Sequence, residues 1–248
     1  MSELLTRIGQ RFTALLIKCK GRPVRLMEFD HVMGFAQALA KSNPAALIDL
    51  VRILLRPLQS DLLLTAIANE MHGARQEIED YKFFMPHGPS HIQMAFDCPR
   101  LDSDQFLVQL NRDPVLPCPW HRDRYVGTLA NIGQGKHFGD WQEDASNHNV
   151  TVWLPWGIAF VHGGNHSIAA GIVGGEGVLR PHEVYDMSRL LDLVYCDGKH
   201  YRSQQDDQVL DTVHDEKIAA LFDVGRLMPQ HGLTPIESTR SRLQRPGS

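Results

Sequence analysis

Residues 150–181 read VTVWLPWGIAFVHGGNHSIAAGIVGGEGVLRP and contain strand, turn and helix signals in one short run. The β-branched and aromatic residues around Leu154-Pro155-Trp156-Gly157 predict a tight hairpin with half-buried strands. Its second strand, IAFV, leads directly into Gly163-Gly164. The small and aliphatic residues of 168–173 then predict a short helix that packs against a sheet and is closed by a second pair of glycines.

The turn between this strand and this helix is a candidate anion site. Gly163 and Gly164 have no side chains, so backbone can approach a ligand closely there. The start of a helix offers N–H groups and partial positive charge, which suit a phosphate or a carboxylate. Asn165, His166 and Ser167 would add side-chain donors. The alternative is an ordinary tight turn in which Asn165 caps the helix.

The bulk composition predicts a globular protein. The chain has 248 residues, 43% of them hydrophobic, enough for one large domain or two small ones. No run approaches the roughly 20 apolar residues that cross a bilayer, and no secretory signal pattern is evident, so we expect a cytoplasmic protein without a membrane. The four scattered cysteines argue against a disulfide framework or a zinc ribbon, and the net charge of −4 against a wide nucleic-acid-binding face.

The N-terminal part predicts an all-helical region, which we bound at residues 1–88. Apolar residues recur at helical spacing in 2–18, in 26–41 and again before Pro57. Pro57 is expected to interrupt the third helix, with a further helix continuing towards Tyr81. Such a region could pack on the rest of the chain, form a homo-oligomer or bind a protein partner.

The expected fold class is α+β, with the helical part followed by a mixed α/β domain in residues 89–203. Prolines and a glycine in 85–91 mark the boundary, and strands and helices alternate after it. Residues 104–113 are expected to form a short helix. Residues 204–248 are expected to hold an amphipathic helix over 209–227, followed by a basic, disordered tail.

A second motif precedes the glycine turn. Residues 115–125 read VLPCPWHRDRY, in which two prolines hold the chain extended and a basic cluster opens a predicted helix. Together with the strand, glycines, histidine and small residues up to Ala170, this order of motifs resembles the ParB/sulfiredoxin superfamily, in its ParB-like branch. The resemblance covers roughly residues 112–187 and implies a ParB/sulfiredoxin-like domain within 89–203.

The resemblance also implies a nucleotide site. In that superfamily the glycine–histidine turn and an arginine of the first motif hold nucleotide phosphates, which points to Arg122 or Arg124 here. Asn165 stands where sulfiredoxin would need a cysteine, so sulfinic acid repair is excluded. Ser167 stands where that enzyme would have an arginine, and the arginine pair of ParB-type clamps is absent near the turn. Arg180 is a further source of positive charge.

These patterns predict an enzyme that acts on a nucleotide or a phosphodiester by nucleoside triphosphate hydrolysis, phosphoryl transfer or nuclease activity. The expected ligand is a nucleoside triphosphate, together with Mg²⁺. The turn would hold phosphate, the histidine would act as donor or general acid, an arginine would stabilise charge, and a carboxylate would act as base or Mg²⁺ ligand. The expected catalytic residues are His166, Arg122, Asp123 and Glu183, and the expected nucleotide-binding residues are Gly163, Gly164, Asn165, His166, Ser167, Arg124 and Arg180.

Other readings remain open. The same fold could hold a ligand without catalysis, and a nuclease would make nucleic acid a partner. No metal-ligand spacing is present, although His121, His137 and His162 could meet in space. His162 and His166 are separated by two glycines, which argues against a zinc-protease helix. A role for His182 as base or ligand is weighed against an ordinary surface position. Family resemblance alone suggests a bacterial phage-defence setting.

Overall fold

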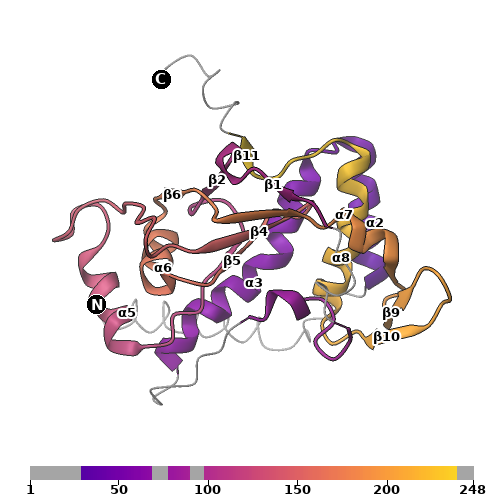
Figure 1. Ribbon diagram of the computed structural model, residues 1–248, viewed down its shortest axis with the longest axis horizontal. Helices are drawn as coiled ribbons and strands as arrows, with labels where there is room; N and C mark the ends of the chain where they lie inside the picture. Colours follow the sequence, from indigo (N-terminus) through magenta and orange to yellow (C-terminus); the bar gives the residue numbers. More distant parts are fainter. Residues whose placement is uncertain (1–28, 69–77, 90–97, 239–248) are drawn as a thin grey trace, which may run out of the picture.

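The computed structural model describes residues 29–68, 78–89 and 98–238. A five-stranded sheet runs through the protein with strand order β1-β7-β4-β5-β3 (Figure 1). β4 pairs antiparallel with β5 and parallel with β7, and β3 lies parallel to β5. The mixture of strands and helices confirms the expected α+β class. The strands are β1 Arg100–Leu101, β3 Val115–Leu116, β4 Val150–Leu154, β5 Ile158–Val161 and β7 Glu183–Asp186.

The predicted hairpin forms β4 and β5 and is anchored to the C-terminal helix. Gly157 has a φ of 71°, and a side chain there would lie within 2.6 Å of Pro235 Cγ, so glycine is required. Trp156 is fully buried, and its Nε1 donates a hydrogen bond of 2.8 Å to the carbonyl of Leu221 in α8, Glu216–Gln230. This buried bond fixes the hairpin against α8.

The two faces of the sheet have different surroundings, as the alternation of side chains along a strand requires. On one face, residues such as Val152 and Val184 pack in an apolar cluster with Ile168 of α6, Asn165–Gly174. The other face contributes Trp153 and other apolar residues to the larger core. At the other end of the strands, this same face carries polar side chains. One face of the sheet therefore forms part of the core at one end and a polar surface at the other.

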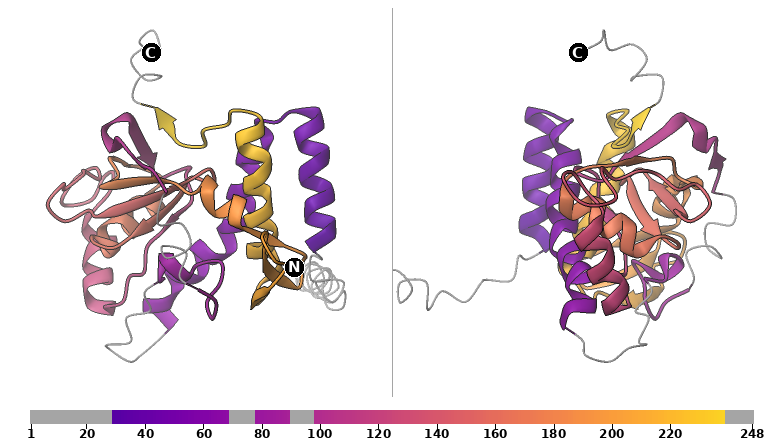
Figure 2. Two further views of the ribbon diagram at one scale, coloured as in Figure 1. Left: turned by 45° about the vertical axis from the view of Figure 1, so that its right-hand side comes forward. Right: turned by 90° about the vertical axis from the view of Figure 1, so that its left-hand side faces the viewer.

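The largest apolar cluster joins helices from both ends of the chain to the sheet. Val32 of α2, Leu55 of α3 and Phe222 of α8 lie in it together with Trp156. Figure 2 shows α2, α3 and α8 packed beside one another next to the sheet. Side chains from all three predicted ranges therefore meet in one core. The bounds are α2 Phe29–Ser42, α3 Ala46–Ala68 and α7 Ser188–Leu193.

Helix α3 corrects the expectation that Pro57 ends a helix. The helix continues through Pro57, which lies on its exposed side. Leu54, Leu55 and Leu62 remain buried on the opposite side. A proline inside a helix costs about 3 kcal/mol, whereas burial of each leucine contributes about 1.5–3 kcal/mol. Packing on both sides of the proline therefore keeps the helix continuous.

The helix expected over 104–113 is also wrong. A 3-10 helix, η2, covers only Ser103–Gln105, and the side chain of Asp102 caps it by accepting from the amide of Asp104. The chain then forms β2, Phe106–Gln109. This segment is a strand because it pairs with a short strand on each side. These partners are β6, Val178–Leu179, and β11, Glu237–Ser238.

The predicted C-terminal helix begins later than expected. Val209–Thr212 form strand β10, which pairs with β9, His200–Ser203. Helix α8 begins at Glu216, where the Asp215 side chain accepts from the amides of Lys217 and Ile218. The strong N-cap at Asp215 thus fixes the start of the helix.

Other predicted elements are confirmed. A helix follows the proline-rich motif, namely α5, Arg122–Asn131. The Asp197-Gly198 dipeptide, which is a strong hairpin-turn signal in a sequence, joins β8, Val194–Cys196, to β9. At the expected domain boundary, Met85 is buried and the amides of His87 and Gly88 donate to Asp211 Oδ2, so this segment is attached to the rest of the protein. The helix expected at 2–18 and the tail beyond 238 lie outside the described residues. So do residues 91–96, whose alternation of polar and apolar side chains predicts a strand.

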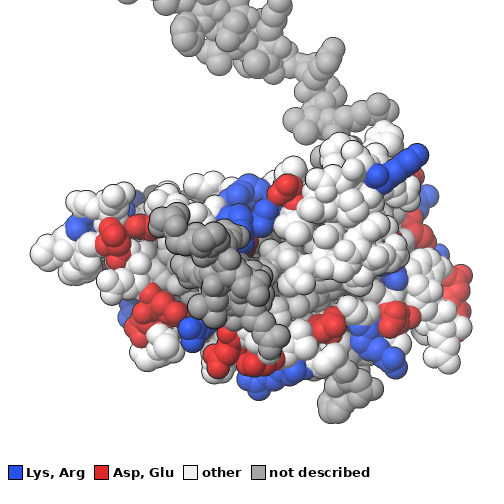
Figure 3. Space-filling view, turned by 90° about the horizontal axis from the view of Figure 1, so that it is seen from above, with Lys and Arg blue, Asp and Glu red and all other residues white. Residues whose placement is uncertain are grey.

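Charged side chains of both signs are visible on one face of the molecule (Figure 3). On the side seen in Figure 3, lysine and arginine side chains are interspersed with aspartate and glutamate. Among the described ranges, no helix is both long and apolar enough to span a bilayer.

Candidate functional site

The glycine turn leads from β5 into α6, and its conformation requires glycine. Gly164 is the N-cap of α6 with a φ of 74°, in the left-handed region. Asn165 is therefore the first residue of the helix and not its cap, which corrects one of the two readings of this turn. The carbonyl of Gly164 accepts from Ile168 at 2.9 Å and closes the first helical turn.

The space beside the two glycines is filled by a neighbouring loop. A side chain on Gly163 would lie 2.6 Å from the carbonyl oxygen of Asn147, and one on Gly164 would lie 2.3 Å from Cδ2 of His148. The amide of Gly163 also donates to Asn149 at 3.1 Å. The expectation that the bare glycines admit a ligand is therefore wrong on this side, because the glycines make room for the loop.

The start of α6 remains available on its other side. The amides of Asn165, His166 and Ser167 have no acceptor in the part of the chain that the structure describes. Three such amides at one helix start are the donors that an anion would use.

The proline-rich motif lies against this helix start. The amide of Cys118 donates to Asn165 Oδ1 at 2.7 Å, and the amide of His121 donates to His166 Nε2 at 3.1 Å. His121 also caps α5, since its Nδ1 accepts from the amide of Arg124. The two motifs are thus joined by two hydrogen bonds.

His166 is a half-buried, neutral imidazole. Burial lowers its pKa below the ordinary value, and the electrostatic effects of the Arg124 guanidinium and the nearby His121 lower it further. Because Nε2 accepts the amide of His121, the proton of the neutral ring lies on Nδ1. His166 can therefore donate a hydrogen bond through Nδ1, while its Nε2 positions the first motif.

Arg124 is the arginine that the structure brings close to the turn. Its Cζ lies 5.7 Å from the ring centre of Trp120, and its charge acts on His166. Arg122 and Asp123 are exposed on α5. Arg180 is also exposed, and its amide donates to Glu143 Oε1 at 2.7 Å. No interaction within the described ranges joins the side chains of Arg122, Asp123 or Arg180 to the turn.

Ser167 and His148 form a pair that could be mistaken for a nucleophile and its base. His148 Nε2 lies 3.1 Å from Ser167 Oγ. However, His148 Nδ1 accepts from the amide of Asp144 at 2.9 Å, so Nε2 of the neutral ring carries the proton. Burial lowers the pKa of His148 and favours this neutral form. Its ring stacks on Trp141, whose Nε1 donates to the carbonyl of Ser167. The pair therefore fixes the loop to α6.

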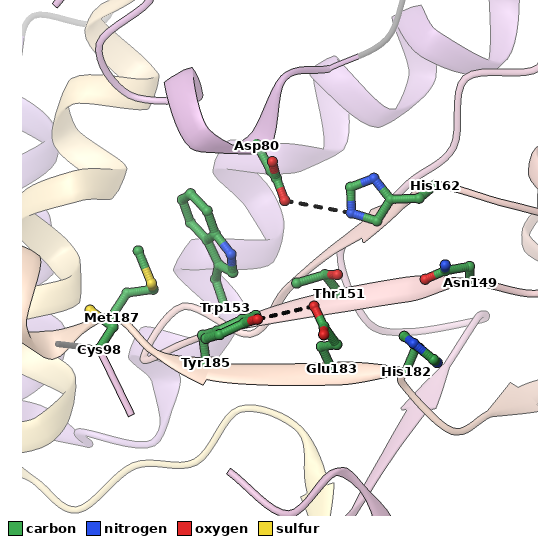
Figure 4. Close-up of a pocket in the computed structure, with 10 residues that line it drawn as sticks. All are labelled: Asp80, Cys98, Asn149, Thr151, Trp153, His162, His182, Glu183, Tyr185 and Met187. Atoms are coloured by element: carbon green, nitrogen blue, oxygen red, sulfur yellow. Dashed lines mark hydrogen bonds and ion pairs between the residues drawn. The ribbon is translucent and has the colours of Figure 1, made fainter. Parts of the chain in front are cut away.

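A cavity of about 470 Å³, which we call the sheet cavity, lies over the polar end of the sheet (Figure 4). Thr151 of β4 pairs with Glu183 of β7, and Trp153 pairs with Tyr185, so these side chains share one face. Asp80, from η1 at Asp80–Lys82, faces them across the cavity. The lining residues are Asp80, Cys98, Asn149, Thr151, Trp153, His162, His182, Glu183, Tyr185 and Met187.

Two polar pairs occupy this cavity. Asp80 Oδ2 lies 3.5 Å from His162 Nε2, and the Tyr185 hydroxyl donates to Glu183 Oε2 at 3.1 Å. Arg100 Nη2 lies 3.3 Å from the other oxygen of Glu183. Burial raises the pKa of Tyr185, and Glu183 raises it further, so the phenol stays protonated. The structure places Glu183 here, in the sheet cavity.

A second cavity of about 410 Å³, which we call the turn cavity, connects this region with the start of α6. It shares Asp80 and His162 with the sheet cavity and also reaches Cys118 and Asn165. Asn165 is only 8% exposed, and Oδ1 is occupied by the Cys118 amide. Its Nδ2 has no partner in the described structure, so this side chain offers its N–H donors to the turn cavity.

A protein-family model, described as "Family of unknown function (DUF6710)", matches residues 15–234. The chain belongs to this family. No curated protein and no solved structure matches it. The function of this DUF6710 member is therefore argued from its own site.

Several cavity residues of this DUF6710 member were missed by sequence reasoning. Asp80 lies in a segment expected to be helical, and no spacing pattern links it to His162. Thr151 and Tyr185 stand at alternate positions of strands that also carry apolar residues, and that alternation was the available signal. His121, His137 and His162, which were weighed as metal ligands, form no metal-binding group. In the ranges described, no three or more histidine, cysteine, aspartate or glutamate side chains are grouped so that they could hold a metal ion.

Proposed function

We propose that this protein binds a nucleotide or a related phosphate ester and acts on it by hydrolysis or phosphoryl transfer. The phosphate would lie in the turn cavity, against the first amides of α6. The orientation of Asn165 carries this proposal, because the Cys118 amide holds Oδ1 and leaves Nδ2 as the donor towards the cavity. Arg124 lies near the same helix start and would supply positive charge.

The proposal includes a divergent ParB-like arrangement of residues 112–187. The order of the two motifs supports it, as do the hydrogen bonds from Cys118 to Asn165 and from His121 to His166. In place of the paired arginines of ParB-type clamps, the turn has Asn165 and the nearby Arg124. A nucleoside triphosphate with Mg²⁺ remains the proposed ligand, and nucleic acid and a protein partner at the N-terminal helices remain predictions.

The proposed catalytic residues would have different roles. His166, neutral and joined to His121, would donate a hydrogen bond to phosphate through Nδ1. Arg124 would stabilise charge in the transition state, since phosphoryl transfer depends mostly on positioning and charge neutralisation. Glu183 would act as a general base from the sheet cavity. Arg122 and Asp123, exposed on α5, would contact the outer part of a bound nucleotide.

Nucleotide titration of paired arginine variants tests the proposal. The full chain is titrated by calorimetry with ATP, CTP and GTP, each with Mg²⁺, and product is followed by chromatography. We expect at least one nucleotide to bind and to be turned over. We expect Arg124→Ala to weaken its binding roughly tenfold or more, the loss of one charge-assisted hydrogen bond. The matched surface variant Arg180→Ala should bind as the wild type does.

Three results of this titration have different meanings. Binding without turnover would favour a non-catalytic binding protein. Equal weakening by both arginine variants would indicate a general charge effect and would count against the assigned position of the phosphate. Absence of binding by every nucleotide would refute the proposal.

A further inference from the structure

We infer that the sheet cavity binds the sugar hydroxyls of the phosphate ester whose phosphate lies in the turn cavity. The inference rests on the proposed function and adds the class of substrate, a sugar phosphate or a nucleotide with an intact vicinal diol. It follows from an unpaired hydroxyl that lines the sheet cavity, from the acceptors around it and from the residues that the two cavities share.

Thr151 is a polar side chain with an unsatisfied hydroxyl. It lies in the middle of β4, is only 5% exposed and lines the sheet cavity. Its hydroxyl makes no hydrogen bond with protein in the structure described. Among the described residues this hydroxyl is not one of the fully buried unpaired atoms, so it opens onto the cavity, where a ligand could supply its hydrogen-bond partner.

Acceptors surround this hydroxyl. Glu183 stands beside Thr151 in the register of β4 and β7, and Asp80 lies on the other side of the cavity (Figure 4). Tyr185 and Arg100 each approach one oxygen of Glu183, but a carboxylate has about four acceptor positions and can take further donors. Neighbouring hydroxyls of a sugar could donate to the carboxylates and accept from Thr151, which is the pairing that this lining favours.

The hydrogen-bond donors of the two cavities separate the ends of such a ligand. Carboxylates line both cavities, Asp80 and Glu183 in the sheet cavity and Glu79 and Asp80 in the turn cavity, so their charge does not distinguish the two. The turn cavity also has the side-chain N–H donors of Asn165 at the start of α6, which suit a phosphate oxygen. The cavities share Asp80 and His162, so this pair lies where a sugar would meet its phosphate. Volumes of about 470 and 410 Å³ are adequate for small-molecule sites.

Calorimetric titration of the full chain with three probes tests the inference: inorganic phosphate, ribose 5-phosphate and 2-deoxyribose 5-phosphate. We expect the wild type to bind ribose 5-phosphate at least tenfold more tightly than inorganic phosphate. The deoxy compound should lose most of that gain. Thr151→Val should also lose most of the gain and leave the affinity for inorganic phosphate unchanged, and Glu183→Gln should lose most of the gain.

Two further variants separate a specific effect from a loss of structure. Thr151→Ser retains the hydroxyl and should keep the preference for ribose 5-phosphate. Thr65→Val makes the same chemical change on α3, away from both cavities, and should bind all three probes as the wild type does. A loss of the preference in Thr65→Val, or its retention in Thr151→Val, would overturn the inference.

The outcomes also distinguish this inference from the proposed function. If inorganic phosphate binds in an Arg124-dependent manner and the sugar adds no affinity, the proposed function stands and the sugar site is wrong. If neither phosphate nor ribose 5-phosphate binds, both are wrong.

Discussion

The histidines of the turn are neutral because of where they are placed. Burial lowers the pKa of both His148 and His166, whose ordinary value is 6.5. His148 accepts from Asp144 and His166 accepts from His121, each through one ring nitrogen. At the scale of single residues, the turn is thus built on two imidazoles that must remain unprotonated to keep these bonds.

Acid should therefore destabilise the fold. A group whose pKa is lower in the folded state binds more protons when unfolded, so its stabilising effect is present above pH 6.5 and is lost as pH falls through the folded-state pKa. We expect the free energy of unfolding, measured in urea at pH 7.5, 6.0 and 5.0, to fall with pH. His148→Asn, which keeps an acceptor for Asp144, should reduce that fall.

The control for this experiment is His137→Asn, at an exposed position. It should leave the pH dependence as it is in the wild type. An unfolding free energy that is constant or rises between pH 7.5 and 5.0 would contradict the role given to the buried histidines.

At the scale of elements, local signals were sufficient where neighbours in sequence decide the structure. The hairpin at Leu154–Gly157 and helix α6 were predictable because turn residues and small apolar residues lie within a few positions of one another. The continuity of α3 through Pro57 and the strand at 209–212 were not predictable, because tertiary packing and strand pairing decide them. Likewise, no local sequence pattern indicates that Asp80 lies close to His162 in the fold.

The two glycines at the start of α6 offer a test at this scale. Gly164→Ala would combine a left-handed φ of 74° with a contact of 2.3 Å to the buried ring of His148. Gly135→Ala is a matched control, since its φ is 75° and nothing lies within 4 Å. We expect Gly135→Ala to lower the free energy of unfolding by about 1–2 kcal/mol, and Gly164→Ala by a further 1–3 kcal/mol or so.

Urea denaturation of the two glycine variants measures the difference. Equal losses in the two would show that the loop at 147–149 does not restrict Gly164 as the structure describes.

At the scale of the whole molecule, α2, α3 and α8 share a core with the sheet, which is one of the arrangements expected for the helical part, namely packing on the rest of the chain. Chain order alone could not reveal this, since Phe222 contacts Trp156 and Phe84 across long separations in sequence. The same arrangement brings η1 to the open face of the sheet and so completes the sheet cavity.

A shared core predicts one cooperative unfolding transition. Phe222→Ala removes a fully buried ring and should lower the free energy of unfolding by about 3–5 kcal/mol. Because the core is shared, tryptophan fluorescence and far-ultraviolet circular dichroism should shift together in urea. Two separated transitions, with the helical signal unaffected by Phe222→Ala, would instead indicate that the predicted ranges 1–88 and 89–203 fold independently.

The most direct test of the proposed site is calorimetric titration of Asn165→Asp with ATP, CTP and GTP in the presence of Mg²⁺. The substitution keeps an oxygen for the Cys118 amide and replaces the Nδ2 donors by a negatively charged oxygen at the turn cavity. A folded variant, with wild-type circular dichroism, that binds its nucleotide at least tenfold more weakly than the wild type is the predicted result. Unchanged nucleotide affinity in that folded variant would contradict a phosphate position at the start of α6.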